Sequence, residues 1–361
     1  MEKIARNTMV NEFHYMSDVG NTIFVRSKNL EPLIGCDRLY LKFEGGNPTG
    51  TQKDRATLAI LQAAANAGCD AVAIATCGNF GASFAHFGCA LGFEVHIFFP
   101  SGYHMGRVRE IKGYGADIHP VDGSYEVTVA ESSEEAEAHG WYNANPGMNG
   151  NSETSFEAYS SISREIYNSL GRGPAAVSVP VGNGTTLTGI YLGFRRLYER
   201  GIIKSVPAMI AASTTRGNPV VKSFLMNSRV IQDLTPKEVR ETTINEPLVN
   251  WHSFDGQAAL DALYESNGYA ATASDDSMIA FARLLAREEG LNVLPASTSS
   301  LVALRSFAAQ RGGDGTFIAV LTGRKFYVSR SPNAAPLDEA PPVHRQVQLE
   351  ETNLPQNKLS S

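Results

Sequence analysis

The lysine at position 53 follows a glycine-rich turn and precedes an apolar helical run, a placement that can make its amine reactive. The turn covers residues 42–55, with the sequence KFEGGNPTGTQKDR, and the apolar run covers residues 56–67. A lysine amine is a useful nucleophile when its pKa is lowered or when it binds a carbonyl group covalently. The positive end of a helix dipole discourages protonation of an amine beside it. The pattern indicates a lysine that forms a Schiff base.

A second glycine-rich loop, at residues 179–190 with the sequence VPVGNGTTLTGI, is suited to binding a phosphate group. The glycines let backbone N–H groups converge, the hydroxyls add donors, and the start of the following helix favours an anion. The loop lacks the lysine of a Walker loop and the GxGxxG spacing of a dinucleotide site. Taken alone it is also compatible with an ordinary strand-to-helix turn. The candidate phosphate-binding residues are Gly182, Asn183, Gly184, Thr185 and Thr186.

Two more polar turns can complete a cofactor site. In the turn at residues 77–83 (CGNFGAS), Asn79 can hydrogen-bond a cofactor oxygen, and the N–H groups can bind a substrate carboxylate. Thr322 follows the last expected strand and can place its hydroxyl against a ring nitrogen. Alone, Asn79 is equally suited to capping a helix, and Thr322 to being buried and satisfied by backbone groups. The lysine turn, the phosphate loop and these two turns together indicate pyridoxal 5'-phosphate (PLP).

Short apolar runs alternate with helical stretches along most of the chain. Strands are expected at residues 39–43, 71–75, 94–99, 115–121, 175–181, 208–212 and 317–321. Helices are expected at residues 56–67, 82–91, 105–114, 156–170, 276–289 and 299–311. This alternation predicts an α/β fold with parallel sheets that carry helices on their faces. The 361 residues fit two domains of ordinary size.

Composition narrows the class of protein. The net charge of -6 argues against nonspecific nucleic-acid binding, which needs a basic face. The sequence has no run of 18 apolar residues, so no membrane span is expected, and its polar beginning lacks the apolar core of a signal peptide. The four cysteines show neither metal-type nor disulfide-type spacing, which favours a reducing cytoplasm: Cys36, Cys69, Cys77 and Cys89.

The order of these motifs resembles that of the fold-type II PLP-dependent enzymes, and within that group most of all threonine synthase. The likeness is carried by residues 47–55 (NPTGTQKDR), 179–184 (VPVGNG) and 320–323 (VLTG), and it extends over residues 15–327. It implies two doubly wound parallel-sheet domains with PLP in the cleft between them. The large domain would comprise residues 1-57 and 151-328, with a small domain at 58-150 inserted in it. Residues 329-361 would form a proline-rich, flexible tail.

Carried over position by position, the resemblance implies that Lys53 is the Schiff-base lysine, that Asn79 contacts the ring hydroxyl of PLP, and that Thr322 lies at the pyridine nitrogen. It also implies that Gly182 to Thr186 surround the 5'-phosphate. Candidate substrate-binding residues are Thr51, Cys77, Gly78, Phe80, Gly81 and Ser297.

The substrate half of the motif set departs from the family pattern. Residues 51–52 are TQ where the family has SF, residues 77–80 are CGNF where SGNT is common, and residues 294–298 are LPAST where EPAG is frequent. The segment 145–150 (NPGMNG) lacks an arginine that resembles a phosphate contact in threonine synthases. These departures leave the cofactor motifs intact and weaken O-phosphohomoserine as the substrate.

A threonine at the ring nitrogen suits elimination and replacement at the β or γ carbon better than transamination. We expect γ-replacement of the threonine synthase type, on O-phosphohomoserine or a related activated amino acid, with water or another nucleophile. The alternative within the same chemistry is β-replacement or dehydration, as in cysteine synthases and threonine dehydratases. A PLP-binding regulator without turnover and a nucleotide-binding protein are alternatives from other classes. The expected partners are a small amino acid and, in a homodimer, a second copy of the chain, with no nucleic acid and no membrane.

Overall fold

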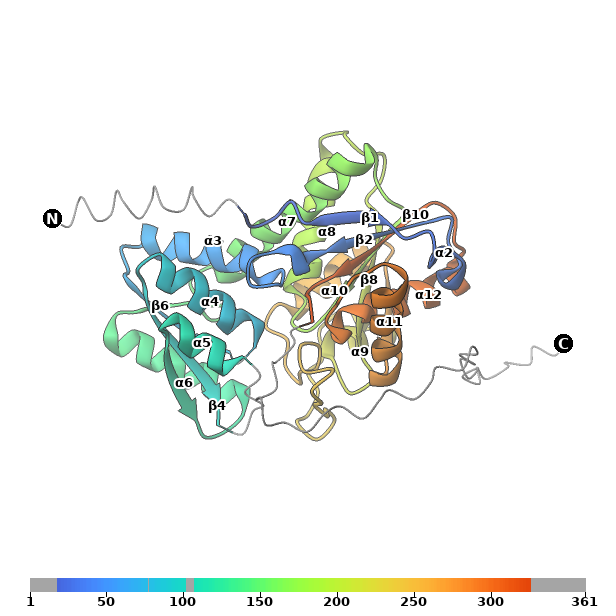
Figure 1. The fold of residues 1–361 in the computed structure, drawn as a ribbon. Helices are drawn as coiled ribbons and strands as arrows, with labels where there is room; N and C mark the ends of the chain where they lie inside the picture. The colour runs from blue at the N-terminus through green and yellow to red at the C-terminus, as the bar shows by residue number, and fades with distance from the viewer. Residues whose placement is uncertain (1–17, 77, 102–106, 326–361) are drawn as a thin grey trace, which may run out of the picture. The chain divides into compact units, whose positions relative to one another are not determined.

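The fold is taken from a computed structural model that describes residues 18–76, 78–101 and 107–325. Cys77 and the predicted tail at 329-361 lie outside the described residues, as does the beginning of the helix expected at 105–114. Two sheets organise the described chain, and each carries helices on both faces (Figure 1). No helix within these ranges has the length and apolar character needed to cross a bilayer.

The larger sheet has six strands in the order β1-β2-β10-β7-β8-β9. Neighbouring strands are parallel, except that β1 runs antiparallel to β2. The strands are β1 (Ile23–Arg26), β2 (Arg38–Phe43), β7 (Ala176–Pro180), β8 (Ala208–Thr214), β9 (Tyr269–Ala273) and β10 (Thr316–Leu321). One face packs against α7 (Asn151–Leu170), α8 (Thr185–Glu199), α9 (Pro219–Leu225) and α10 (Gly256–Glu265). The other face packs against α2 (Glu31–Ile34), α11 (Asp275–Glu288) and α12 (Ser299–Arg311).

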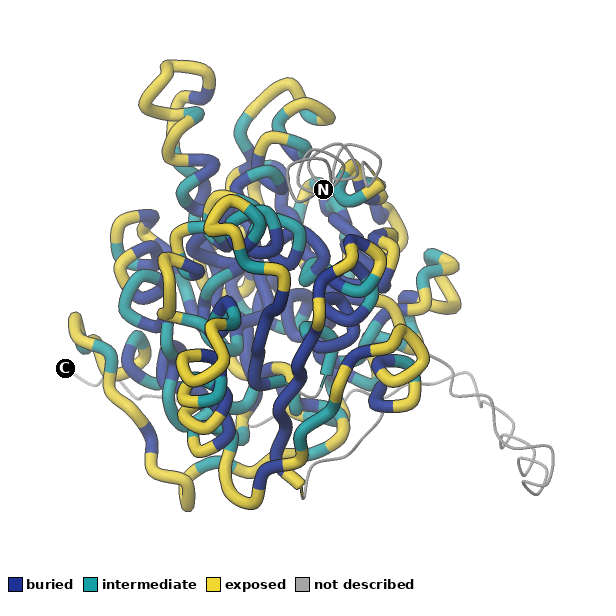
Figure 2. Tube along the Cα trace, turned by 90° about the vertical axis from the view of Figure 1, so that its left-hand side faces the viewer, coloured by how far each residue is buried: buried dark blue, intermediate teal, exposed yellow. Residues whose placement is uncertain are grey.

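Strand β10 shows why the apolar runs in the sequence become central strands. Phe317, Ala319 and Leu321 pack on the α12 side of the sheet, while Ile318 and Val320 pack on the α7 and α8 side. All five are buried, as Figure 2 shows for the strands in the interior. A strand covered on both faces needs apolar residues at every position, which explains the uninterrupted run.

The smaller sheet has four parallel strands in the order β5-β4-β3-β6. They are β3 (Ala71–Ala75), β4 (Glu94–Pro100), β5 (Asp117–Val121) and β6 (Tyr142–Asn143). Helices α3 (Lys53–Asn66), α4 (Asn79–Ala90) and α5 (Val108–Tyr114) cover one face, and α6 (Tyr125–His139) covers the other. The predicted α/β fold with parallel sheets is therefore confirmed. The boundaries of an inserted small domain stay a prediction.

Some elements differ from the sequence-based expectation. Helix α7 begins at Asn151 and not at residue 156, because the Asn151 amide donates to the carbonyl oxygens of Asn143 and Asn145, each at 2.9 Å, and fixes a polar first turn. Helix α6 was not expected, since its sequence YEVTVAESSEEAEAH has no clear apolar period. Strand β1 is exposed at three of its four positions, so it lacks the apolar run of the central strands.

The contact between α7 and α8 depends on glycines. A Cβ atom at Gly193 would lie 2.6 Å from the Ser160 carbonyl oxygen and 2.7 Å from the Ser163 hydroxyl. We expect Gly193→Ala to destabilise the protein by about 1–3 kcal/mol, because the helices must move apart. Gly113→Ala, in α5, is the matched control, because a Cβ there meets nothing within 4 Å and alanine favours a helix by about 1 kcal/mol. Urea unfolding of both variants measures the difference, and equal effects would contradict the packing argument.

Candidate active site

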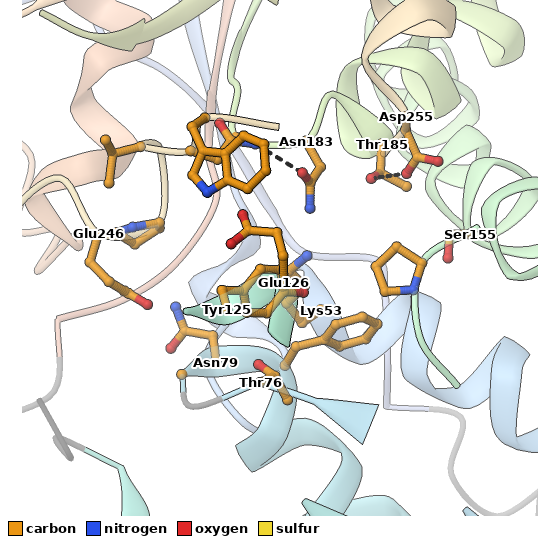
Figure 3. Close-up of a pocket in the computed structure, with 18 of the residues that line it drawn as sticks. Lys53, Thr76, Asn79, Tyr125, Glu126, Ser155, Asn183, Thr185, Glu246 and Asp255 are labelled. Atoms are coloured by element: carbon orange, nitrogen blue, oxygen red, sulfur yellow. Dashed lines mark hydrogen bonds between the residues drawn. The ribbon is translucent and has the colours of Figure 1, made fainter. Parts of the chain in front are cut away.

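A cavity of about 370 Å³ lies where loops from both sheets meet (Figure 3). Thr76 follows β3, Ala144 follows β6 and Gly182 follows β7, and all three line the cavity. The cavity is therefore at the carboxyl ends of parallel strands, where open α/β sheets usually bind their ligands.

Lys53 is the first residue of α3 and points its side chain into this cavity (Figure 3). Gly50, with φ of 85°, makes the tight turn before it. The turn is fixed to the end of β10, because Gln52 N–H donates to the Thr322 carbonyl oxygen at 3.0 Å and Thr51 forms an antiparallel bridge with Gly323. A central strand of the large sheet thus holds the lysine in place.

The Lys53 amine lies in an environment that favours its neutral form. Its Nζ atom is 4.5 Å from the centre of the Phe80 ring, and it has no hydrogen bond or ion pair with any residue that the structure describes. Burial lowers the pKa of Lys53, while the charges of Asp255 and Glu246 oppose this effect. An unpaired amine with a lowered pKa is suited to covalent attachment of a carbonyl compound.

The loop between β7 and α8 forms a cradle for an anion. The N–H groups of residues 182–186 have no hydrogen-bond acceptor among the described residues. A Cβ at Gly182 would lie 2.7 Å from the Pro247 carbonyl oxygen, and Gly184 has φ of 92°, so both positions favour glycine. Free N–H groups at a helix N-terminus bind phosphate well. The loop therefore fits the phosphate group of PLP.

Two polar side chains lie beside this loop, Tyr159 and Asp255. The Tyr159 hydroxyl is buried and has no hydrogen-bond partner of good geometry among the described residues. Burial raises the pKa of Tyr159, and the nearby Thr186 side chain opposes the rise. Asp255 accepts hydrogen bonds from the Thr185 and Ser152 hydroxyls. Burial raises the pKa of Asp255, and these two hydrogen bonds oppose the rise. A ligand in the cradle would compete with Asp255 for the Thr185 hydroxyl.

Asn79 begins α4 and is oriented by Arg107. The guanidinium of Arg107 donates to Asn79 Oδ1 at 2.9 Å and to the Thr49 carbonyl oxygen at 3.1 Å, and it pairs with Glu110 at 2.7 Å. The carbonyl end of the Asn79 amide is therefore engaged, and its NH₂ group remains to donate to a ligand oxygen. This orientation fits the predicted contact with the ring hydroxyl of PLP.

Thr322 and Ser297 lie next to each other, and Thr322 contacts the turn that carries Lys53. Their hydroxyls are 3.0 Å apart, and Gly323 N–H donates to Ser297 Oγ at 3.0 Å. Both side chains are buried. The structure thus brings the predicted ring-nitrogen partner close to the lysine turn.

The predicted site residues divide into two groups. Those that line the described cavity are Lys53, Gly78, Asn79, Phe80, Gly182, Asn183 and Thr185. Those outside its lining are Thr51, Gly81, Gly184, Thr186, Ser297 and Thr322. Cys77 lies outside the described residues. The roles assigned to these residues stay predictions.

Four acidic residues in the described lining of the cavity were not among the predicted site residues: Glu126, Glu241, Glu246 and Asp255. Glu246 and Asp255 belong to the long segment between α9 and α10, which has no regular secondary structure. Glu126 lies in the first turn of the unexpected helix α6. No motif or period marked these positions, so only folding could reveal them.

Glu246 has an unusual protonation equilibrium. Burial, reinforced by the charge of Glu241 and opposed by that of Lys53, raises the pKa of Glu246 from near 4.5 to about 7. In the unfolded chain the proton is lost near pH 4.5, so the folded protein holds an extra proton between pH 4.5 and 7. The free energy of unfolding therefore decreases as pH rises through this window.

We expect Glu246→Gln to remove this loss of stability. The free energy of unfolding of the variant should exceed that of the wild type by about 1–2 kcal/mol more at pH 8 than at pH 4.5, because the substituted side chain carries no charge at either pH. Urea unfolding at the two pH values measures the gain. Glu199→Gln, at an exposed position on α8, is the control and should show no such difference. A pH-independent difference between Glu246→Gln and wild type would contradict the raised pKa.

Two doubly wound sheets, parallel except for β1, a lysine at a helix start and a glycine-rich anion cradle together define a fold-type II PLP-dependent enzyme. The family model described as pyridoxal-phosphate dependent enzyme matches residues 15–323, and the chain belongs to this family. PLP is therefore its cofactor.

Relatives and solved structures agree with this assignment. The threonine synthase of Methanosarcina acetivorans is 31% identical over 84% of this chain and 74% of its own. The threonine synthase of Methanocaldococcus jannaschii is 29% identical over 88% of this chain and 76% of its own. Serine racemase from Dictyostelium discoideum has the same fold, with a TM-score of 0.71 at 17% identity over 89% of this chain and 98% of its own. An O-ureido-L-serine synthase has a TM-score of 0.65 at 20% identity, over 86% and 90% of the two chains. The protein is a threonine synthase-like PLP-dependent enzyme.

Proposed function

We propose that the protein eliminates or replaces a leaving group on the side chain of an amino acid, in the manner of a threonine synthase. The observation that carries this proposal is the unpaired, half-buried amine of Lys53, which faces the same cavity as the anion cradle of residues 182–186. PLP, when bound, supplies an electron sink for the carbon next to the substrate nitrogen. Lys53 would link the cofactor and then act as the base that moves the Cα proton.

The other residues have binding and orienting roles in this proposal. The N–H groups from Gly182 to Thr186 would hold the phosphate, and the Asn79 amide would donate to the ring hydroxyl. The Thr322 hydroxyl, which is hydrogen-bonded to the Ser297 hydroxyl, would place a neutral group against the ring nitrogen. Because no acid would then be at that nitrogen, elimination and replacement are favoured over transamination.

Thr51 and the turn around Gly78 would receive the substrate. Thr51 lies two residues before the lysine, and Gly81 lies in the first turn of α4, whose N–H groups suit a carboxylate. Cys77, although outside the described residues, precedes this turn in the sequence. Phe80 lies against the Lys53 amine and would limit the space above the cofactor.

A β-replacement or dehydration of a shorter amino acid is the second candidate. The Phe80 ring, 4.5 Å from Lys53 Nζ, favours it by reducing the room for a long side chain. The γ- and β-reactions would use the same cofactor-binding residues, so the two candidate functions differ in their substrates.

A substrate panel tests the proposal. Purified enzyme with PLP is given O-phosphohomoserine, O-acetylserine or threonine in separate reactions, and the release of phosphate, acetate or ketoacid is followed. Phosphate release together with threonine formation identifies γ-replacement, acetate release identifies β-replacement, and ketoacid formation identifies dehydration. A visible cofactor band that responds to none of the amino acids, with no product, would reject an enzymatic role and favour a PLP-binding regulator.

We propose a cytoplasmic homodimer in which a small domain at 58-150 closes over the substrate and excludes water. Light scattering of the purified protein tests the dimer, and a monomer at micromolar concentration would contradict it.

A further inference from the structure

The described lining of the cavity carries four carboxyl groups and a single basic side chain. The acidic residues are Glu126, Glu241, Glu246 and Asp255, and the basic one is Lys53. In the proposed reaction Lys53 is engaged with the cofactor, and the cofactor phosphate brings further negative charge to the Gly182 loop. A substrate side chain entering this cavity would therefore meet carboxyl groups with no spare cation among the described lining residues.

Glu246 lines the cavity and lies at its left-hand side in Figure 3. Its Oε1 atom is 3.4 Å from the position of a Cβ built on Gly78, in the turn that begins α4. The next residue, Pro247, presses its carbonyl oxygen against Gly182 in the anion cradle. The Glu246 carboxyl is thus beside the Gly78 turn, while its backbone is anchored beside the phosphate loop.

The segment that carries Glu246 is held firmly. Glu246 N–H donates to the Thr242 carbonyl oxygen at 3.0 Å. The buried side chain of Asn245 donates to the Thr214 hydroxyl at 3.3 Å and to the Arg240 carbonyl oxygen at 3.1 Å, and it accepts from Thr242 N–H at 2.8 Å. The backbone that carries the Glu246 carboxyl group is therefore held in place, so this group can discriminate between ligands by its position.

Unsatisfied polar atoms in the same cavity point independently to a polar ligand. Tyr159 is 1% exposed, and its hydroxyl has no hydrogen-bond partner of good geometry among the described residues. The Oε2 atom of Glu126, which also lines the cavity, is buried without a partner there. Buried polar atoms are nearly always hydrogen-bonded in native proteins, and a carboxylate oxygen needs a donor.

We propose that the side chain of the substrate ends in a neutral or positively charged group that donates hydrogen bonds, and not in a phosphate, and that Glu246 accepts from that group. The inference rests on the amino-acid replacement or elimination proposed above. The raised pKa of Glu246 supports it, because a carboxyl group that ionises near neutrality gains most from a cationic partner. A phosphate dianion would meet Glu246 and Glu126 as like charges.

Three amino acids with the same carbon skeleton test this inference. O-Phosphohomoserine, homoserine and 2,4-diaminobutyrate end in a phosphate, a hydroxyl and an ammonium group. Their dissociation constants are measured at pH 8 by titrating the Lys53→Ala protein loaded with PLP, using calorimetry and the visible spectrum. Thermal shift of the wild-type enzyme with PLP provides a second measurement that needs no turnover. We expect homoserine and 2,4-diaminobutyrate to bind at least about tenfold more tightly than O-phosphohomoserine.

The Glu246→Gln substitution, made in the same background, tests the role of this residue. It should reduce the preference for 2,4-diaminobutyrate over O-phosphohomoserine about tenfold, because the amide carries no charge. Glu238→Gln, in the same segment and paired with Lys222 at the surface, should leave the preference unchanged. Tighter binding of O-phosphohomoserine than of homoserine, or an unchanged preference in Glu246→Gln, overturns this inference and leaves the proposed function standing. A lack of response to all three ligands and to every substrate in the panel above overturns both.

Discussion

Replacing Lys53 with alanine is expected to abolish turnover, with a loss of at least about 10³-fold in kcat. The amine is the first residue of α3, faces the cavity and has no polar partner among the described residues. No other basic side chain in the described lining can replace it, so both the covalent link to the cofactor and the base for the Cα proton are lost. Steady-state rates with the best substrate measure the effect, and the visible band of the bound cofactor should shift.

Two further variants make this result specific. Lys53→Arg keeps the positive charge but cannot form the covalent link, so it should be as inactive as Lys53→Ala. Lys204→Ala, at an exposed position, should retain full activity. Turnover within tenfold of wild type in Lys53→Ala, with an unchanged cofactor band, would remove Lys53 from the mechanism.

Arg55→Ala is expected to have the largest effect on stability, a loss of about 3–5 kcal/mol. Arg55 lies two residues after Lys53 and pairs with Glu44 and Glu165, each at 2.7 Å. Lys42 completes the network, because its Nζ is 2.6 Å from Glu165. Removing the guanidinium leaves the fully buried Glu44 without its main partner, and it loosens the turn that holds Lys53.

Urea unfolding at pH 7 measures this loss. Arg195→Ala is the matched control, because Arg195 forms an exposed pair with Glu199 on α8 and should contribute no more than about 0.5 kcal/mol. Although burial opposes it, hydrogen bonding from Arg55 lowers the pKa of Glu165 from near 4.5 to about 2. The stability supplied by the pair is therefore present above pH 4.5 and is lost as pH falls toward 2. Equal losses in Arg55→Ala and Arg195→Ala would show that the buried network is not stabilising.

The fold and the centre of the candidate site follow largely from local sequence. The parallel strands were predictable because a strand buried on both faces must be apolar throughout, as β10 is. Lys53 and the loop from Gly182 to Thr186 were predictable because turn geometry and helix starts depend on a few contiguous residues. Strand β1 and helix α6 were not predictable, because each mixes polar and apolar residues on its faces. Packing against other elements decided their conformation.

The sequence by itself determined which segments form strands, where the reactive lysine lies and that an anion cradle precedes α8. Only the tertiary structure decided which side chains surround that lysine. Glu246, Asp255 and Glu126 come from segments without a period or motif, and Ser297 and Thr322 pair across 25 positions of the chain. The physical reason is that hydrogen bonding and apolar periodicity act over neighbouring residues, whereas the charge and burial of a site depend on segments that meet only after the sheets have packed.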